Sequence, residues 1–229
     1  AQTKFTWLND VKDELWKRDL IADCVKNGVP HDPKTCNGPH YGGTSHAGLI
    51  NEKTLKTFQD MGFTYLDYGL EHWDNKILKN LGKGATAEAN KRAMQLHINT
   101  GIQPVPNQII MFPDESWDSL NTMLDAWEET GIVTSPFICT PYPGSEWYIK
   151  YKDFIVEQYG GKLESFINDL EDATKITALL TRKFTPSEAV GIQKIMSQAS
   201  ISGDFDNARR LLAISKKMKE SGIIEHKTS

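Results

Sequence analysis

The stretch Gly62–Tyr148 constrains the fold more than any other part of this 229-residue chain. Three short β-type runs in it, Thr64–Tyr68, Gln108–Phe112 and Val133–Cys139, alternate with stretches of helical spacing. Strands that alternate with helices imply a parallel sheet with right-handed crossovers. Each run ends in a polar or Gly/Pro-rich turn, and such sheets bind ligands at the carboxyl ends of their strands. The sequence therefore predicts an α/β protein whose site lies in these turns.

Further elements are predicted on either side of this stretch. Lys4–Leu8 can form a strand followed by a helix, and Ser45–Ile50 is expected to be another short strand. Beyond about residues 159–161 the strand signals stop and helical segments follow. We therefore predict that residues 1–159 form a partial parallel (βα) barrel of about five strands. Residues 160–229 are expected to form a helical C-terminal extension.

Capping residues fix the ends of several predicted helices. Asn51 is a good N-cap, and Gly62 is a good stop for the helix between them. Thr185-Pro-Ser-Glu188 is a capping box with Pro at the first helical position. The other helices are expected at Asn75–Leu81, Thr86–Thr100, Ser116–Thr130, Leu163–Leu180 and Phe205–Ser221, with a break at Gly203–Asp204.

The composition argues against several classes of protein. Lys and Arg number 26 against 30 Asp and Glu, so the net charge is −4, and no run of like charge suggests nucleic-acid binding through phosphate contacts. No apolar stretch approaches membrane-spanning length. Cys24, Cys36 and Cys139 are too few and too scattered for a disulfide framework, which favours a reducing cytoplasm. The start at Ala1 is consistent with a truncated or excised piece of a longer protein.

Three turns carry candidate binding residues. Glu71 follows Gly69 at a strand end, where a carboxylate can accept hydrogen bonds from ribose hydroxyls and a glycine lets a ligand approach the backbone. The alternative is an ordinary capping or surface carboxylate. Pro113–Ser116 could hold an anion, although capping of its own helix explains these residues better. Thr140–Gly144 is a rigid loop that could bind a flat base or merely shape the turn.

A loop with zinc-ligand residue types precedes these turns. It contains His31, Asp32, Cys36, His40 and His46, but no C-x-x-C or H-x-x-x-H spacing organises them, so no metal ligand is assigned. Neither a G-x-S-x-G nucleophile elbow nor a G-x-x-x-x-G-K-[ST] phosphate loop is present.

The order of the motifs resembles that of radical S-adenosylmethionine (radical SAM) enzymes. Gly69-Leu-Glu71 and Lys83-Gly-Ala-Thr86 are similar to the G-I-E-S and K-G-T-T of that family. Met111-Phe-Pro-Asp-Glu-Ser116 resembles G-F-P-G-E-T, and Thr140-Pro-Tyr-Pro-Gly-Ser145 resembles T-P-Y-P-G-T. The resemblance covers roughly Lys4–Tyr148. It is strongest to the branch with the Elp3/MiaB-type core, which is often joined to a cobalamin-binding domain.

This resemblance implies an enzyme that binds SAM and a 4Fe-4S cluster, possesses a six-unit partial barrel and, in some members, uses cobalamin. The cluster reduces SAM, and the 5′-deoxyadenosyl radical then drives hydrogen abstraction or methyl or sulfur transfer. By position, Glu71 would contact the SAM ribose beside Gly69, and Ser45 or His46 would lie near the methionine moiety. The residues expected to flank adenine are Gln108, Ile110, Thr140, Pro141 and Tyr142. The resemblance does not identify the catalytic residues or the substrate.

Several departures from the family pattern matter. The cluster motif C-x-x-x-C-x-x-C is absent, and because Lys4–Leu8 would be the second of six strands, that loop would precede Ala1. The chain alone is therefore expected to be inactive and to need a missing N-terminal segment. His46 stands where many members have Arg, His72 replaces Ser and Met111 replaces Gly. The alternatives are a non-catalytic α/β binding protein and a metal-dependent barrel enzyme that uses the histidine-containing loop.

Overall fold

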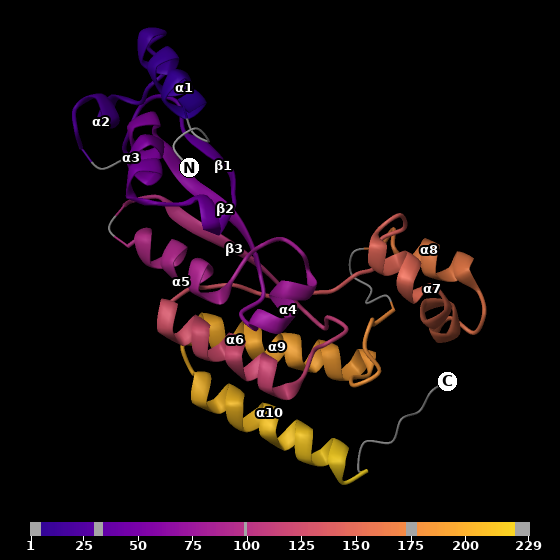
Figure 1. The fold of residues 1–229 in the computed structure, drawn as a ribbon. Coiled ribbons are helices and arrows are strands. Elements are labelled where there is room, and N and C mark those ends of the chain that lie inside the picture. Colours follow the sequence, from indigo (N-terminus) through magenta and orange to yellow (C-terminus); the bar gives the residue numbers. More distant parts are fainter. Residues whose placement is uncertain (1–5, 30–33, 99, 173–177, 223–229) are drawn as a thin grey trace. The chain divides into compact units, whose positions relative to one another are not determined.

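A computed structural model describes residues 6–29, 34–98, 100–172 and 178–222. The chain divides into two compact units, Ala1–Leu70 with Gly82–Asn107 and Glu71–Leu81 with Gln108–Ser229. A four-stranded parallel sheet runs in the order β1-β2-β3-β4 (Figure 1). Its strands are β1 Tyr41–Ser45, β2 Phe63–Glu71, β3 Gln103–Ile110 and β4 Phe137–Ile138.

In the first unit, β1 pairs in parallel with β2, from Gly42 opposite Tyr65 to Ser45 opposite Tyr68. Side chains of β2 alternate, since Leu66, Tyr68 and Leu70 are buried while those between them are more exposed. Tyr68 reaches the end of one helix, where its hydroxyl lies 2.7 Å from His97 Nε2. The helical elements are α1 Thr6–Lys17, α2 Asp23–Lys26, the 3-10 turn η1 Ala47–Leu49, α3 Glu52–Met61 and α5 Ala87–Leu96.

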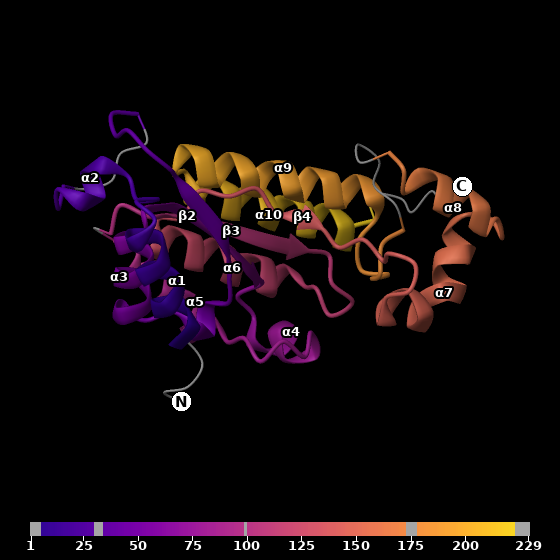
Figure 2. The same ribbon diagram turned by 90° about the horizontal axis from the view of Figure 1, so that it is seen from above.

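In the second unit, the end of β3 pairs in parallel with β4, Ile109 opposite Phe137 and Ile110 opposite Ile138. The helices are α4 Asn75–Asn80, α6 Trp117–Thr130, α7 Glu146–Gln158, α8 Leu163–Asp169, α9 Pro186–Ser202 and α10 Phe205–Glu220. The two C-terminal helices α9 and α10 pack on α6 and on each other (Figure 2). Arg209 links α10 to α6 by two ion pairs, because its guanidinium lies 2.7 Å from Asp125 and 2.5 Å from Glu128 of α6.

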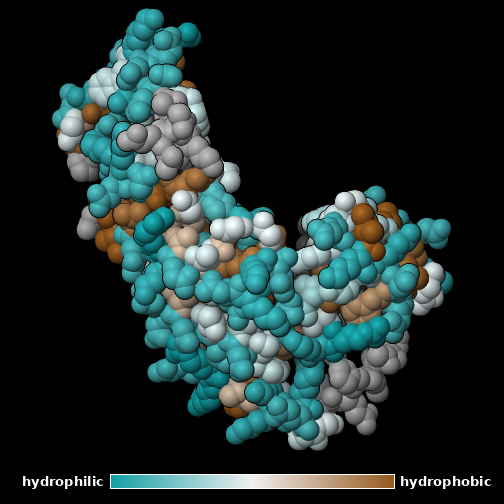
Figure 3. Space-filling model, viewed as in Figure 1, coloured by the Kyte–Doolittle hydropathy of each residue, from teal (hydrophilic) through white to brown (hydrophobic). Residues whose placement is uncertain are grey.

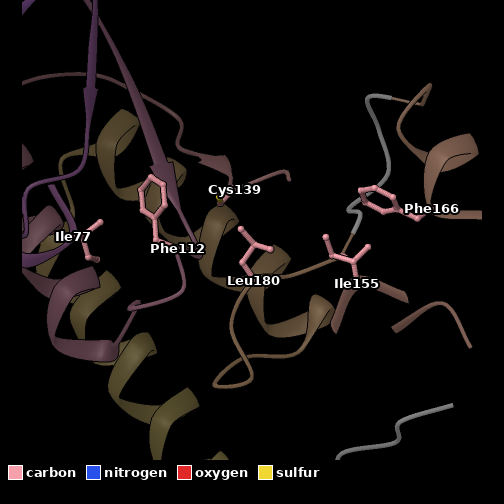
Figure 4. Packing of buried hydrophobic residues seen from close by; sticks show 7 residues of the cluster. Ile77, Phe112, Cys139, Ile155, Phe166 and Leu180 are labelled. Atoms are coloured by element: carbon pink, nitrogen blue, oxygen red, sulfur yellow. The ribbon is translucent and has the colours of Figure 1, made fainter. Parts of the chain in front are cut away.

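An apolar cluster of the second unit joins the strand ends to the helices that follow them. Its buried members are Ile77, Phe112, Cys139, Ile155, Phe166, Ala178 and Leu180 (Figure 4). They come from α4, the turns after β3 and β4, α7, α8 and the segment before α9. The face of the molecule in Figure 3 is mostly hydrophilic. No helix among the described residues is long and apolar enough to cross a membrane.

The predicted helix ends are confirmed where capping residues are present. Asn51 accepts the N–H of Thr54 and Gly62 ends that helix in the left-handed conformation. Ser116 caps α6 in the same way, and Thr185 forms the predicted capping box with Glu188 at the start of α9. The predicted break between the last two helices also lies at Gly203–Asp204.

The strand predicted at Lys4–Leu8 is wrong over its described part, because residues 6–8 belong to α1. Buried Leu8 lies three and seven residues before Val11 and Leu15, so it continues the helical stripe. The described residues therefore form four strands in place of about five. The strand expected at Ser45–Ile50 is also misplaced, since β1 ends at Ser45 and η1 follows it.

Other predicted boundaries shift as well. The run Val133–Cys139 contributes only the two residues of β4, and the helix expected over Leu163–Leu180 ends at Asp169. A predicted domain boundary after residue 159 stays a prediction.

The sulfur atoms of Cys24 and Cys36 form a disulfide, with an S–S distance of 2.00 Å. The cysteine spacing had predicted no such pairing, and the cytoplasmic location inferred from it stays a prediction.

Candidate functional site

A cavity of about 610 Å³ opens beside the carboxyl ends of β1 and β2 in the first unit. Its walls include Ser45 and His46, at and just after the end of β1, and Gly69 near the end of β2. Lys83 contributes a cationic side chain to the same cavity. Three of the nine residues predicted to bind SAM therefore line one hollow, together with Lys83, a member of a family-like motif to which the sequence had assigned no role.

Glycines leave the backbone of β1 open to this cavity. Gly42 and Gly43 line it, and neither carries a side chain that would cover the strand. A Cβ atom at Gly42 would lie 2.1 Å from the Tyr65 ring, which rests against the strand at this point. The aromatic residues that line the cavity itself are Trp7, Phe58 and Phe63.

His46 is held in one orientation by its own turn. Its Nδ1 accepts a 3.1 Å hydrogen bond from the backbone N–H of Gly48, which caps η1. A neutral His46 therefore carries its proton on Nε2 and can donate a hydrogen bond to a ligand through that nitrogen.

In the second unit, the ends of β2 and β3 both carry a residue in the left-handed conformation. Glu71 has φ 62° and Met111 has φ 67°, and both are buried. Such a conformation costs a non-glycine residue on the order of 1 kcal/mol or more, and it gathers at functional sites. The family motif has glycine where this chain has Met111, and the positive φ explains why glycine is favoured there.

Glu115 connects these two strand ends. Its Oε2 accepts a 2.8 Å hydrogen bond from the N–H of Met111, and its Oε1 accepts one from the Ser119 hydroxyl. Oε1 also lies 3.4 Å from Nε2 of His72, the residue after Glu71. Because His72 Nδ1 accepts the N–H of Asp74 at 2.9 Å, a neutral His72 carries its proton on the nitrogen that faces Glu115.

The sequence did not identify this role of Glu115, which it treated as part of an ordinary helix cap. Two signals were present, a carboxylate next to an apolar run and the match of Glu115 to the E of G-F-P-G-E-T. The 0% exposure of Glu115, however, follows from tertiary packing.

Cys139 lies close to the same carboxylates. Burial, together with the negative charges of Glu115 and Glu71, raises the pKa of its thiol to about 12. Its backbone N–H donates to Ile110 O at 2.8 Å, which extends the pairing of β3 with β4. Glu71 and the Cys139–Thr140 strand end therefore lie at the same end of the second unit.

The other residues predicted to contact SAM differ in their burial and in their hydrogen-bond partners. Gln108 is fully buried, and its Oε1 accepts the indole N–H groups of Trp73 and Trp127, each at 2.9 Å. Ile110 is fully buried, and Thr140 donates its hydroxyl to Ile138 O at 3.2 Å. Pro141 is buried and Tyr142 is 62% exposed. A role of these residues beside adenine stays a prediction.

The described residues do not fit an iron–sulfur cluster. Cys24 and Cys36 are joined to each other, and Cys139 is buried. Within the described ranges, no group of three His, Cys, Asp or Glu side chains could hold a metal ion. His31 and Asp32, two of the zinc-ligand types noted in the sequence, lie outside the described residues.

Comparison with known proteins identifies a family and a relative that matches over part of its length. The model of the radical SAM superfamily matches residues 11–127. The uncharacterized methyltransferase PH0819 of Pyrococcus horikoshii is 29% identical over 103 residues, which are 44% of this chain and 22% of that protein. This chain therefore spans about a fifth of the length of that relative.

Two solved structures match over about a quarter of their own length. The radical SAM methyltransferase TsrM of Kitasatospora setae, solved with cobalamin and a 4Fe-4S cluster, matches with 15% identity and a TM-score of 0.45 over 59% of this chain and 25% of its own. Elp3 of Methanocaldococcus infernus matches with 20% identity and a TM-score of 0.41 over 49% of this chain and 28% of its own. The family model covers just over half of the chain, and the chain belongs to the radical SAM superfamily.

Proposed function

We propose that this chain carries the SAM-binding part of a radical SAM methyltransferase. Family membership implies an enzyme that uses SAM and a 4Fe-4S cluster. The observation that carries the proposal is the cavity of about 610 Å³ that brings Ser45, His46, Gly69 and Lys83 together beside two strand ends. That volume lies within the range of sites for small molecules and cofactors.

The charges of the cavity suit the methionine half of SAM. The Lys83 ammonium would attract the methionine carboxylate, and the His46 Nε2–H and the Ser45 hydroxyl would donate hydrogen bonds to it. The open backbone at Gly69 would let the ligand approach the strand closely.

In the second unit, the Glu71 carboxylate would accept hydrogen bonds from the ribose hydroxyls. Support for this role comes from its buried position at a strand end and from its strained backbone. The residues predicted to flank adenine, Gln108, Ile110 and Thr140–Tyr142, belong to this same unit.

The iron–sulfur cluster would need thiolates that this chain does not supply, so no radical step is assigned to its residues. Cys24, Cys36 and Cys139 lack the family spacing, and the structure gives each another environment. We propose that the cluster ligands come from a further polypeptide segment and that this chain alone is inactive. The cluster, when bound, would supply the electron that cleaves SAM.

Methyl transfer is the proposed reaction class because the relative from Pyrococcus horikoshii is named a methyltransferase. A cobalamin requirement of the full-length protein and a cytoplasmic location stay predictions. Of the alternatives, a non-catalytic α/β binding protein remains, whereas the metal-dependent enzyme loses Cys36 of its loop to the disulfide.

Binding of S-adenosylhomocysteine to the purified chain, measured by isothermal titration calorimetry, tests the proposal. Lys83→Met removes the cation from the cavity and should weaken binding by about five- to tenfold, as expected for a partly exposed ion pair. Glu71→Gln should also weaken binding, while Lys53→Met, at an exposed lysine of α3, should leave it unchanged. Absence of saturable binding to the unaltered chain, or equal binding by the Lys83 variant, contradicts the proposal.

A further inference from the structure

A second, smaller hollow of about 220 Å³ lies in the second unit, between α4, the turn after β3 and α7. It shares no lining residue with the cavity of the first unit. The hollow adjoins the carboxyl end of β3, where open α/β sheets bind their ligands. Its lining includes three aromatic side chains, Phe112, Trp147 and Tyr151, and three polar ones, Asn80, Asp114 and Lys150.

The aromatic wall is anchored in the core. Phe112 is only 2% exposed and belongs to the apolar cluster shown in Figure 4. Trp147 packs edge to face against it, with ring centroids 5.3 Å apart, and Tyr151 also packs on this cluster. Because Phe112 is buried, the rings open to the hollow are those of Trp147 and Tyr151, and fixed rings favour a flat partner through offset and edge-to-face contacts.

The negative charge at the hollow is already compensated. Asp114 Oδ1 lies 3.2 Å from the Lys76 ammonium, and Asp114 Oδ2 accepts a 2.5 Å hydrogen bond from the Asn80 amide. These two partners hold the pKa of Asp114 below its ordinary value, the Lys76 contact most strongly. Asp114 is therefore ionised at neutral pH and does not need a cationic ligand.

The positive charge at the hollow is not compensated in this way. Lys150 lies 5.4 Å from the centroid of the Tyr151 ring, and none of the described carboxylates forms an ion pair with it. An anionic group on a ligand would give this ammonium a partner beside the aromatic wall. The nearby Asp114 carboxylate would disfavour a ligand with a second negative charge.

We propose that this hollow binds a small planar monocarboxylate, with its ring against Trp147 and Tyr151 and its carboxylate on Lys150. The volume is below the 300–1,000 Å³ typical of sites for drug-sized molecules, so it suits a single ring with one short substituent. A ligand of this size binds with a dissociation constant on the order of millimolar.

Ligand-observed NMR titrations of the whole chain test this proposal with two probes that share one ring. Benzoate carries the carboxylate, and benzamide replaces it by an uncharged group of similar shape. We expect saturable binding of benzoate and at least about fivefold weaker binding of benzamide. Equal affinities for the two probes, or no saturable binding of benzoate, would overturn the proposal.

Two lysines of α7 provide matched variants. Lys150→Met should weaken benzoate binding by about fivefold and remove the preference over benzamide, because the carboxylate loses its partner. Lys152→Met removes the same charge two residues along the helix, on a side chain that does not line the hollow, and should leave the affinity unchanged. Equal weakening by both variants would show nonspecific attraction and would refute the site.

Discussion

The Glu115 carboxylate accepts a 2.8 Å hydrogen bond from the backbone N–H of Met111, a buried residue in the left-handed conformation. Its other oxygen lies 3.4 Å from Nε2 of His72. Because His72 directly follows Glu71, the second left-handed residue, one carboxylate connects both strained strand ends. Glu115 thus helps to position Glu71, the residue proposed to contact the SAM ribose.

Glu115→Gln should lower the free energy of unfolding by about 1–3 kcal/mol, the usual cost of leaving a buried hydrogen-bonding group unsatisfied. The amide keeps the size of the side chain, but its NH₂ group cannot accept hydrogen bonds. Urea unfolding followed by circular dichroism measures the change. Glu146→Gln, at an exposed position in the first turn of α7, is the control and should change stability by less than about 0.5 kcal/mol. A loss no larger in the Glu115 variant would show that this carboxylate does not stabilise the strand ends.

The buried His97 should make stability depend on pH. Its Nδ1 donates to Ile102 O at 2.8 Å and its Nε2 faces the Tyr68 hydroxyl, so the neutral ring is fully hydrogen-bonded. Burial lowers the pKa of His97, and the contact with Ile102 O only partly offsets this effect. As the pH falls below about 6.5, the unfolded chain therefore binds the proton first, and the free energy of unfolding should decrease.

Urea unfolding between pH 8 and pH 5 tests this expectation. The decrease should be smaller in His97→Gln, which has no titratable group at this position. Identical pH profiles for the two proteins would show that His97 does not contribute.

Helix ends could be predicted from the sequence because their determinants are local. Asn51, Ser116 and Thr185 each cap a helix within three residues of themselves. Strand boundaries were predicted less well. The strand β3 begins at Gln103, before Pro104 and Pro106, and prolines within a run argue against a strand when the sequence alone is read.

The features of the candidate site that were missed depend on contacts between distant residues. The residue types of Glu71 and Met111 do not indicate that they adopt positive φ, since neither is glycine. The disulfide between Cys24 and Cys36 likewise depends on tertiary structure. The two residues are twelve positions apart, and the chain between them must fold back to bring their sulfur atoms together. The strand-end positions of Glu71 and Thr140 followed from the β/α alternation, whereas their hydrogen-bonding partners did not.

The number of reactive thiols should depend on folding and on reduction. Cys139 is buried and its thiol pKa is raised to about 12, so the native chain should react only slowly with a thiol reagent such as 5,5′-dithiobis(2-nitrobenzoate) at pH 8. Cys24 and Cys36 should not react before reduction, because their sulfur atoms are joined in a disulfide. We expect one fast thiol after unfolding without reductant and three after reduction. Three fast thiols in the unreduced, unfolded chain would show that the disulfide does not form.

Anaerobic reconstitution with iron and sulfide should give no stable cubane cluster on this chain. A 4Fe-4S cluster requires several cysteine thiolates around one centre. The chain has three cysteines, of which two are joined to each other and the third is buried next to the carboxylates of Glu71 and Glu115. Even after reduction, Cys24 and Cys36 are twelve residues apart and lack the spacing of the family motif.

The outcome of this reconstitution is measured by the absorbance near 400 nm and by the iron content after desalting. A sample that receives iron without sulfide gives the background. A control in which Cys24, Cys36 and Cys139 are all replaced by Ser should retain as little iron as the unaltered chain. Stoichiometric iron and sulfide that survive desalting, and that the triple variant loses, would show that these cysteines do hold a cluster. In that case the disulfide would be absent from the functional form, and the chain would not need thiolates from a further segment.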